Sequence, residues 1–210
     1  MPRRALVVAN GTLPREAIVR REARAADFIL AADGGARHLL RLGLRFDAAL
    51  GDFDSFTQPL PPGVQRIDAP DQNRTDLDKA CGYLQAAGCD EITLLAATGD
   101  RLDHTFGALG VLCKYGARLV DDVGEARGLL GPGALYLRTF PGQIVSLLPC
   151  GIVEGLTTRG LKWELTDQRF AFAERDGTSN VALAESVEVC ARSGWVVAYA
   201  HHAPALEDAA

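Results

Sequence analysis

Long apolar runs are missing from the sequence: the longest, such as Ile92 to Ala97, are only a few residues long. A membrane helix needs roughly 20 apolar residues in a row, so no membrane partner is expected. No secretory signal precedes Arg3 and Arg4, and the five cysteines form no CxxC pair. We therefore expect a cytoplasmic protein whose cysteines are reduced.

Clustered positive charge is also lacking, because 22 Lys and Arg stand against 27 Asp and Glu, for a net charge of -5. Binding to a nucleic-acid duplex needs a basic surface that displaces counterions, so nucleic acid is not an expected partner. No spaced set of Cys and His ligands, no Gly-x-Ser-x-Gly elbow and no Walker or dinucleotide glycine pattern is present. Phosphate chemistry with magnesium remains compatible with what the sequence does contain.

An alternation of short apolar runs and helical stretches extends from Ala5 to about Asp121 and predicts a parallel sheet with helical crossovers. The expected strands are Ala5 to Ala9, Phe28 to Ala32, Phe46 to Leu50 and Glu91 to Ala97. The expected helices are Arg15 to Arg24, Ala36 to Leu42, one that starts after Thr75 as N-cap and ends at Gly88, and Asp103 to Tyr115.

Beyond Val123, glycines and prolines interrupt short runs rich in Leu, Val and aromatic residues. Such a pattern is typical of antiparallel strands. The predicted fold class is thus α/β, with an N-terminal parallel-sheet α/β domain (1–130) followed by a C-terminal all-β sandwich domain (133–203). Residues 204–210 are expected to form a tail.

Four polar segments follow predicted strands or begin predicted helices. Because the carboxyl ends of parallel strands meet at one edge of a sheet, we expect these segments to converge on one crevice. They are Asp33-Gly34-Gly35, Gly51-Asp52-Phe53-Asp54-Ser55, Asp71-Gln72-Asn73-Arg74-Thr75-Asp76 and Thr98-Gly99-Asp100-Arg101-Leu102-Asp103-His104.

Carboxylates in these segments suggest a metal site. Asp52 and Asp54, two residues apart, face the same way in an extended segment, and a magnesium ion between them would relieve their repulsion. An acidic surface turn is the alternative. Asp76 could simply complement the dipole of its helix, but Lys79 lies one turn further, so a metal ligand and a phosphate-binding ammonium could share a helix face.

The remaining polar residues have less specific interpretations. Gly34 and Gly35 would let the backbone approach a ligand and adopt positive φ, although a tight strand-to-helix turn is the more frequent reason for such a pair. Arg101 is placed to neutralise a phosphate. His104 is either a neutral hydrogen-bonding group or a structural histidine. The other histidines, His38, His201 and His202, are expected at the surface.

In these motifs the sequence resembles the thiamine pyrophosphokinase family. The resemblance covers nearly the whole chain in the family's order and includes the four polar segments, Lys79, and Gly177-Thr178-Ser179-Asn180. It implies an N-terminal domain that binds ATP and a C-terminal β-sandwich that helps to form a thiamine site across a homodimer.

The resemblance also implies roles for individual residues. Asp52, Asp54 and Asp76 would hold Mg²⁺ against the phosphates, with Lys79 and Arg101 assisting catalysis. The nucleotide would lie against residues of the first domain, namely Asp33, Gly34, Gly35, Gln72, Thr75, Lys79, Arg101, Asp103 and His104. Thiamine would contact Thr178, Ser179, Asn180 and Trp195, the last from the partner subunit.

Two positions depart from the family pattern: Ala108 stands where Asn is frequent, and Glu164 where Pro is common. The expected reaction is transfer of the diphosphate of ATP to the hydroxyl of thiamine, giving thiamine diphosphate and AMP. Asp71 is one possible general base. The alternatives are a diphosphokinase for another small alcohol such as a pterin, and a non-catalytic nucleotide or thiamine sensor.

Overall fold

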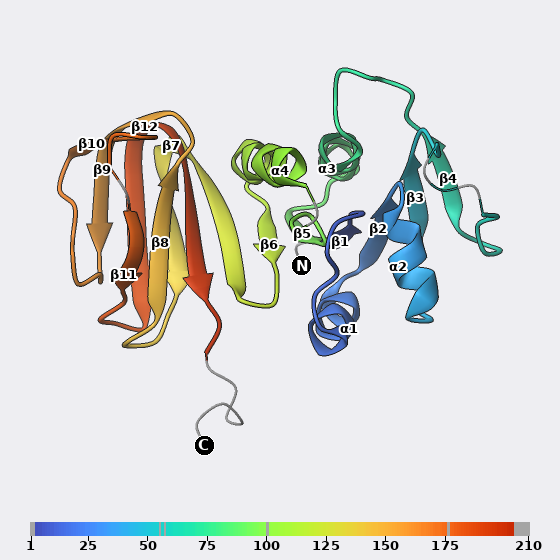
Figure 1. The fold of residues 1–210 in the computed structure, drawn as a ribbon, viewed down its shortest axis with the longest axis horizontal. Coiled ribbons are helices and arrows are strands. Elements are labelled where there is room, and N and C mark those ends of the chain that lie inside the picture. Colours follow the sequence, from blue (N-terminus) through green and yellow to red (C-terminus); the bar gives the residue numbers. More distant parts are fainter. Residues whose placement is uncertain (1–2, 55, 57, 100, 176, 204–210) are drawn as a thin grey trace. The chain divides into compact units, whose positions relative to one another are not determined.

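The computed structural model describes residues 3–54, 56, 58–99, 101–175 and 177–203, which form two compact units (Figure 1). Unit 1 comprises the chain up to residue 111 together with 117–122. Unit 2 comprises residues 112–116 and the chain from residue 123 onward.

Unit 1 contains a parallel sheet with the strand order β6-β5-β1-β2-β3-β4. The chain moves outward from β1 to β4 and then returns to the other side of β1 with β5. Ligands of open α/β sheets bind outside the carboxyl ends of the strands at such a reversal. The strands are β1 (Arg4–Val8), β2 (Phe28–Ala32), β3 (Ala48–Gly51), β4 (Gln65–Asp68), β5 (Glu91–Leu95) and β6 (Arg118–Val120).

Helices cover both faces of this sheet: α1 (Glu16–Ala25) and α2 (Gly35–Arg41) lie on one side and α3 (Asp76–Ala86) on the other (Figure 1). This follows from right-handed crossovers, because the connection from β4 to β5 runs in the opposite direction to the earlier ones. The longest helix is α4 (Leu102–Tyr115). Within the described residues, no helix is long and apolar enough to cross a bilayer.

The predicted order of elements in unit 1 is confirmed, with two additions. β4 and β6 were not predicted from the sequence. β4 is an edge strand whose residues, Gln65 to Asp68, are mostly exposed, so it lacks the apolar run that marks the central strands. β6 has only three residues. The N-cap at Thr75 is confirmed, since its hydroxyl accepts a hydrogen bond from Asp78 N at 3.2 Å.

Unit 2 is β-rich and antiparallel. Its two longest strands, β7 and β12, pair along their lengths. The first half of β12 also pairs with β9, which pairs with β10, and its second half pairs with β8, which pairs with β11. The strands are β7 (Gly124–Arg138), β8 (Ile144–Pro149), β9 (Ile152–Arg159), β10 (Gln168–Ala171), β11 (Gly177–Val181) and β12 (Ser186–His201).

Strand β7 begins at Gly124, about ten residues before the position where the sequence suggested the β domain. Its glycines do not break the strand. Instead, they permit close approach of neighbouring backbone: a Cβ at Gly124 would lie 2.3 Å from Ala200 O, and one at Gly131 would lie 2.8 Å from Ser193 N. A register shift in β12 between Ala191 and Gly194 accommodates the bend opposite Gly131.

Candidate active site

A cleft of about 570 Å³ lies at the carboxyl ends of the strands of unit 1. Loops that follow β1, β2, β3, β4 and β5 all contribute to its lining, as the rule for parallel sheets predicts. Its polar lining includes residues from all four predicted segments together with Lys79, namely Asp33, Asp52, Asp54, Gln72, Arg74, Thr75, Asp76, Lys79, Arg101 and His104.

Three carboxylates gather in this cleft: Asp33, Asp52 and Asp54 each offer an oxygen within 4.8 Å of the others. Asp33 is only 7% exposed and has a φ of 41°, which fixes it at the end of β2. The sequence had placed Asp33 with the nucleotide and Asp76 with the metal. In the structure this carboxylate group contains Asp33, and it does not include Asp76.

Asp52 accepts two hydrogen bonds, from Asp54 N at 3.2 Å and from Gln72 Nε2 at 3.2 Å. These bonds, with the backbone bond from Asp54 contributing most, lower the pKa of Asp52 below its ordinary value. Its carboxylate is therefore ionised over the whole physiological pH range. A charged, exposed oxygen is what a divalent cation requires.

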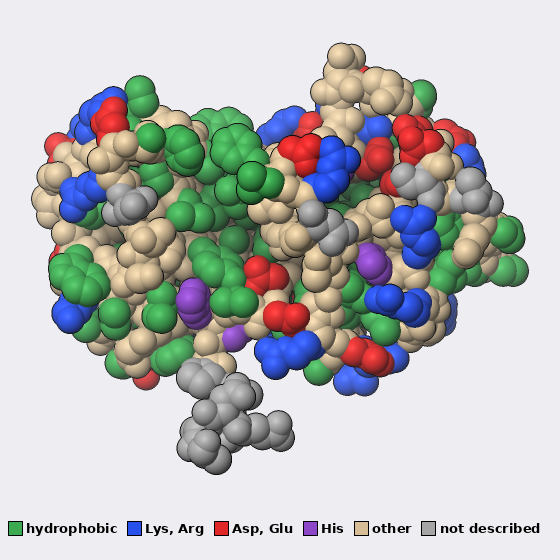
Figure 2. All heavy atoms as spheres, in the orientation of Figure 1, with side chains coloured by type: hydrophobic (Ala, Val, Ile, Leu, Met, Phe, Trp, Pro, Cys, Tyr) green, Lys and Arg blue, Asp and Glu red, His purple; other side chains and the backbone are tan. Residues whose placement is uncertain are grey.

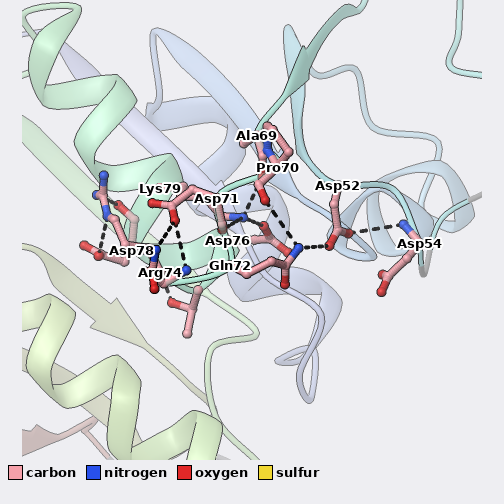
Figure 3. A network of polar contacts seen from close by, with 12 residues as sticks. Asp52, Asp54, Ala69, Pro70, Asp71, Gln72, Arg74, Asp76, Asp78 and Lys79 are labelled. Carbon is pink, nitrogen blue, oxygen red and sulfur yellow. Dashed lines mark hydrogen bonds and ion pairs between the residues drawn. The ribbon is translucent and has the colours of Figure 1, made fainter.

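Asp76 lies one turn before Lys79 on α3, as the spacing predicted, and the two form an ion pair of 2.7 Å (Figure 3). Lys79 also donates to Ala69 O at 2.7 Å and to Asp71 O at 3.1 Å. The Lys79 side chain is only 9% exposed. It thus joins α3 to the loop that follows β4, hereafter the 69–72 loop.

Gln72 extends from the 69–72 loop to Asp52, and Figure 3 shows its side chain next to that carboxylate. Asp71 accepts hydrogen bonds from the backbone N–H and side-chain amide of Asn73 at 2.9 and 3.0 Å. The backbone bond is the main cause of a lowered pKa at Asp71. A carboxylate with a lowered pKa is a weak general base, which argues against that role for Asp71.

Arg101 and Asp103 form an exposed bidentate pair, with 64% of each side chain accessible. Their hydrogen bond raises the pKa of Arg101 and lowers the pKa of Asp103. The backbone N–H of His104 donates to Asp103 at 2.9 Å. Figure 2 shows acidic and basic side chains side by side on the surface of unit 1. Exposed pairs of this kind exchange partners readily, because each is worth only about 0–1 kcal/mol.

Gly34 and Gly35 have a different role from the one expected. Positive φ belongs to Asp33, and neither glycine has it. Both are needed for close approach: a Cβ at Gly34 would lie 2.4 Å from the side chain of Asn10, and one at Gly35 would lie 1.9 Å from Val8 O. The two glycines therefore pack the start of α2 against the end of β1.

The loop after β1 was not predicted to line the cleft, and in the loop after β5 the predicted segment began only at Thr98, so Asn10, Gly11, Ala96 and Ala97 are additions to the predicted lining. The signal was available for Asn10-Gly11, since this pair ends a predicted strand at the same edge of the sheet. His38, expected at the surface, is partly buried, and its Nε2 lies 3.0 Å from Gly11 O.

The four residues predicted to contact thiamine lie on β11 and β12 of unit 2. Thr178 and Ser179 are exposed, and Ser179 has a φ of 60°. Trp195 is half-buried on β12. Asn180 is engaged within the protein: its Oδ1 accepts from Trp163 N at 3.1 Å, and its Nδ2 donates to Trp163 O at 2.8 Å.

The two departures from the family pattern have local explanations. Glu164 accepts a hydrogen bond from Gly160 N at 2.8 Å and so closes the turn that carries Trp163. Ala108 is buried and lies in the lining of the cleft. A longer polar side chain at that position would occupy part of the cleft, and Ala108 leaves that space open.

Comparisons with known proteins agree with this arrangement. Residues 19–120 match the profile of the thiamin pyrophosphokinase catalytic domain, and residues 136–196 match that of the thiamin pyrophosphokinase vitamin B1 binding domain. Thiamine pyrophosphokinase 2 of Arabidopsis thaliana is 30% identical over 89% of this chain and 82% of its own length.

Solved structures give the same result. A thiamin pyrophosphokinase family protein from Enterococcus faecalis aligns with a TM-score of 0.77 and 26% identity over 95% of this chain and 99% of its own. The fold is also that of thiamin pyrophosphokinase from Geobacillus thermodenitrificans, with a TM-score of 0.80 and 24% identity over 96% and 99% of the two chains. The chain belongs to the thiamine pyrophosphokinase family.

Proposed function

We propose that this protein transfers the diphosphate group of ATP to the hydroxyl of thiamine, giving thiamine diphosphate and AMP. The hydroxyl oxygen forms a bond to the β-phosphorus, the bond from that phosphorus to the bridging oxygen of the α-phosphate breaks, and AMP leaves with that oxygen. The hydroxyl proton is released to solvent. The observation that carries the proposal is the group of three carboxylates, Asp33, Asp52 and Asp54, at the edge of the sheet where open α/β folds bind ligands.

The chemistry of this donor set fits Mg²⁺, which prefers carboxylate oxygens together with phosphate oxygens and water. Asp33, Asp52 and Asp54 would hold the ion, and Asp76 at the same cleft would support it. When bound, the ion supplies neutralisation of charge on the phosphates. Asp52 is suited to this role because its lowered pKa keeps it ionised.

Positioning and charge neutralisation carry most of the catalysis in phosphoryl transfer, so the protein needs little covalent chemistry. Arg101 is more exposed than Arg74, the other arginine in the described lining of the cleft, at 64% against 38%, and it would exchange Asp103 for a phosphate. Gln72, Thr75 and His104 also line the cleft and would contact the nucleotide. None of these contacts requires Asp71 to act as a base.

Unit 2 would supply the thiamine contacts through Thr178, Ser179 and Trp195, within a homodimer that we expect in the cytoplasm. Asn180 would contribute mainly by holding the backbone of Trp163. The alternatives, a diphosphokinase for a pterin alcohol and a non-catalytic sensor, are not favoured by the family matches.

The test is an assay with thiamine, ATP and magnesium in which AMP and thiamine diphosphate are both quantified. We expect the two products in equal amounts from the wild type. Asp54→Asn should abolish both, because it removes one of three charges from the acidic group. Thermal unfolding should show that this variant is folded.

Glu16→Gln is a matched control, because it also removes one exposed carboxylate but lies on α1 in an ion pair with Arg20. It should keep wild-type turnover. Wild-type protein that binds ATP and thiamine without producing AMP would contradict the proposal, as would product formed only with a pterin alcohol.

A further inference from the structure

Lys79 differs from the other cations of the cleft in the way its hydrogen bonds are used. A lysine ammonium has three N–H donors. In the structure three acceptors of the protein lie around it, Ala69 O at 2.7 Å, Asp71 O at 3.1 Å and Asp76 Oδ1 at 2.7 Å. The ammonium is therefore held within the protein by two hydrogen bonds to backbone carbonyls and by one ion pair with Asp76.

Burial makes these contacts hard to exchange. The Lys79 side chain is 9% exposed, whereas that of Arg101 is 64% exposed. Moving the ammonium to a ligand would leave Asp76 without its counter-ion and two carbonyls without a donor, and partly buried groups that lose partners are destabilising. Among the described residues, the side chain of Arg101 pairs with the exposed Asp103, which it could release.

The contacts of Lys79 extend further through the 69–72 loop. Two carbonyls of this loop accept from Lys79, and Gln72 of the same loop donates to Asp52 at 3.2 Å. Figure 3 shows this chain of contacts from α3 to the loop that follows β3. A change at Lys79 should therefore reach both Asp76 and Asp52.

We propose that Lys79 is a positioning residue, which fixes Asp76 and the 69–72 loop, and that it is not a contact of the phosphates. This inference rests on the proposed function and deepens it by giving Lys79 and Arg101 different roles. Lys79 orders the acidic side of the cleft, and Arg101 is a cation that meets the phosphates.

The first test is hydrogen exchange in the ligand-free protein, comparing Lys79→Met with Arg101→Met as the matched loss of a cleft cation. Loss of the Lys79 contacts should accelerate exchange of the backbone amides of the 69–72 loop by about tenfold or more, since several hydrogen bonds hold this loop. Arg101→Met should leave these amides at wild-type rates. Equal rates in Lys79→Met and wild type would overturn the proposal.

The second test compares the affinities for ATP and AMP without added metal, by calorimetry. A residue that contacts the β- or γ-phosphate contributes to the ratio of the two affinities. We expect this ratio to fall by about tenfold in Arg101→Met, as for loss of one charge-assisted bond, and to be unchanged in Lys79→Met. A fall confined to Lys79→Met would overturn the proposal.

A third variant covers the case in which Lys79→Met does not fold. Lys79→Gln keeps two N–H donors but loses the charge, so its loop should exchange at a rate above that of the wild type. Wild-type exchange in Lys79→Gln would count against the proposal. Because exchange is measured without substrate, its outcome is separate from whether thiamine is the acceptor.

Discussion

The cleft of unit 1 and the strand Gly177–Val181 of unit 2 were both marked by polar motifs, yet their side chains are used differently. In the cleft, charged groups from distant loops face one another, and Asp33, Asp52 and Asp54 lie within 4.8 Å. In the strand, the side-chain amide of Asn180 is hydrogen-bonded to the backbone of Trp163. The difference teaches that a polar motif locates a site but does not say which of its members meet a ligand.

The largest effect is expected at Asp33, which should be as important for activity as Asp52. Asp33→Asn should lower kcat/KM for ATP by about 100-fold or more, as for loss of a group that stabilises charge in the transition state. Steady-state kinetics with magnesium checks this. A loss below about threefold would show that Asp33 is only structural.

Gly35 tests whether close packing at the end of β1 shapes the cleft. Gly35→Ala places a Cβ 1.9 Å from Val8 O, so it should lower the free energy of unfolding by about 2–3 kcal/mol, measured in urea. Gly110→Ala is the control, because no described atom lies within 4 Å of its Cβ position, and in a helix it should be neutral or stabilising. Equal stability of the two variants would contradict this explanation.

Asn180 tests whether a polar side chain of the strand Gly177–Val181 has a structural role. Asn180→Ala removes the bonds to both backbone groups of Trp163 and should cost about 1–3 kcal/mol of stability in thermal or chemical unfolding. The exposed Thr178 serves as the neighbour control, and Thr178→Ala should change stability by less than about 0.5 kcal/mol. If Asn180 served only to contact a ligand, both variants would be as stable as the wild type.

The smallest effect is expected at Gln72, whose amide helps to lower the pKa of Asp52. Gln72→Ala should raise that pKa toward its ordinary value without reaching it, because the bond from Asp54 N is the larger cause. A pKa that is lowered on folding stabilises the protein at pH values above the pKa of the unfolded chain. This contribution is lost as the pH falls through the pKa of the folded protein, so the variant should lose it at a higher pH than the wild type does. NMR titration of the Asp52 carboxyl measures the shift.

The sequence predicted most of unit 1 because a buried parallel sheet leaves strong signals: apolar runs, breaks at Asp33-Gly34-Gly35 and a capped helix at Thr75. One rule of topology then placed the predicted segments at one edge. The sequence could not show that the Asp33 carboxylate lies beside those of Asp52 and Asp54, because this depends on the φ of Asp33 and on packing beside β1.

Unit 2 was predicted less well, because glycine has two physical roles. Gly124 and Gly131 looked like breaks, but they permit close backbone contact within one long strand. Lys79 and Asn180 were predicted to contact ligands, and each forms hydrogen bonds with backbone groups of the protein. A pattern of side chains in the sequence does not reveal such backbone partners.

Crystals grown with ATP analogue and Mn²⁺, a divalent ion whose anomalous scattering locates it, test the central idea most directly. We expect the ion to be bound by carboxylate oxygens from at least two of Asp33, Asp52 and Asp54, at roughly 2.2 Å. An ion bound in the cleft without any of these three carboxylates would contradict the account.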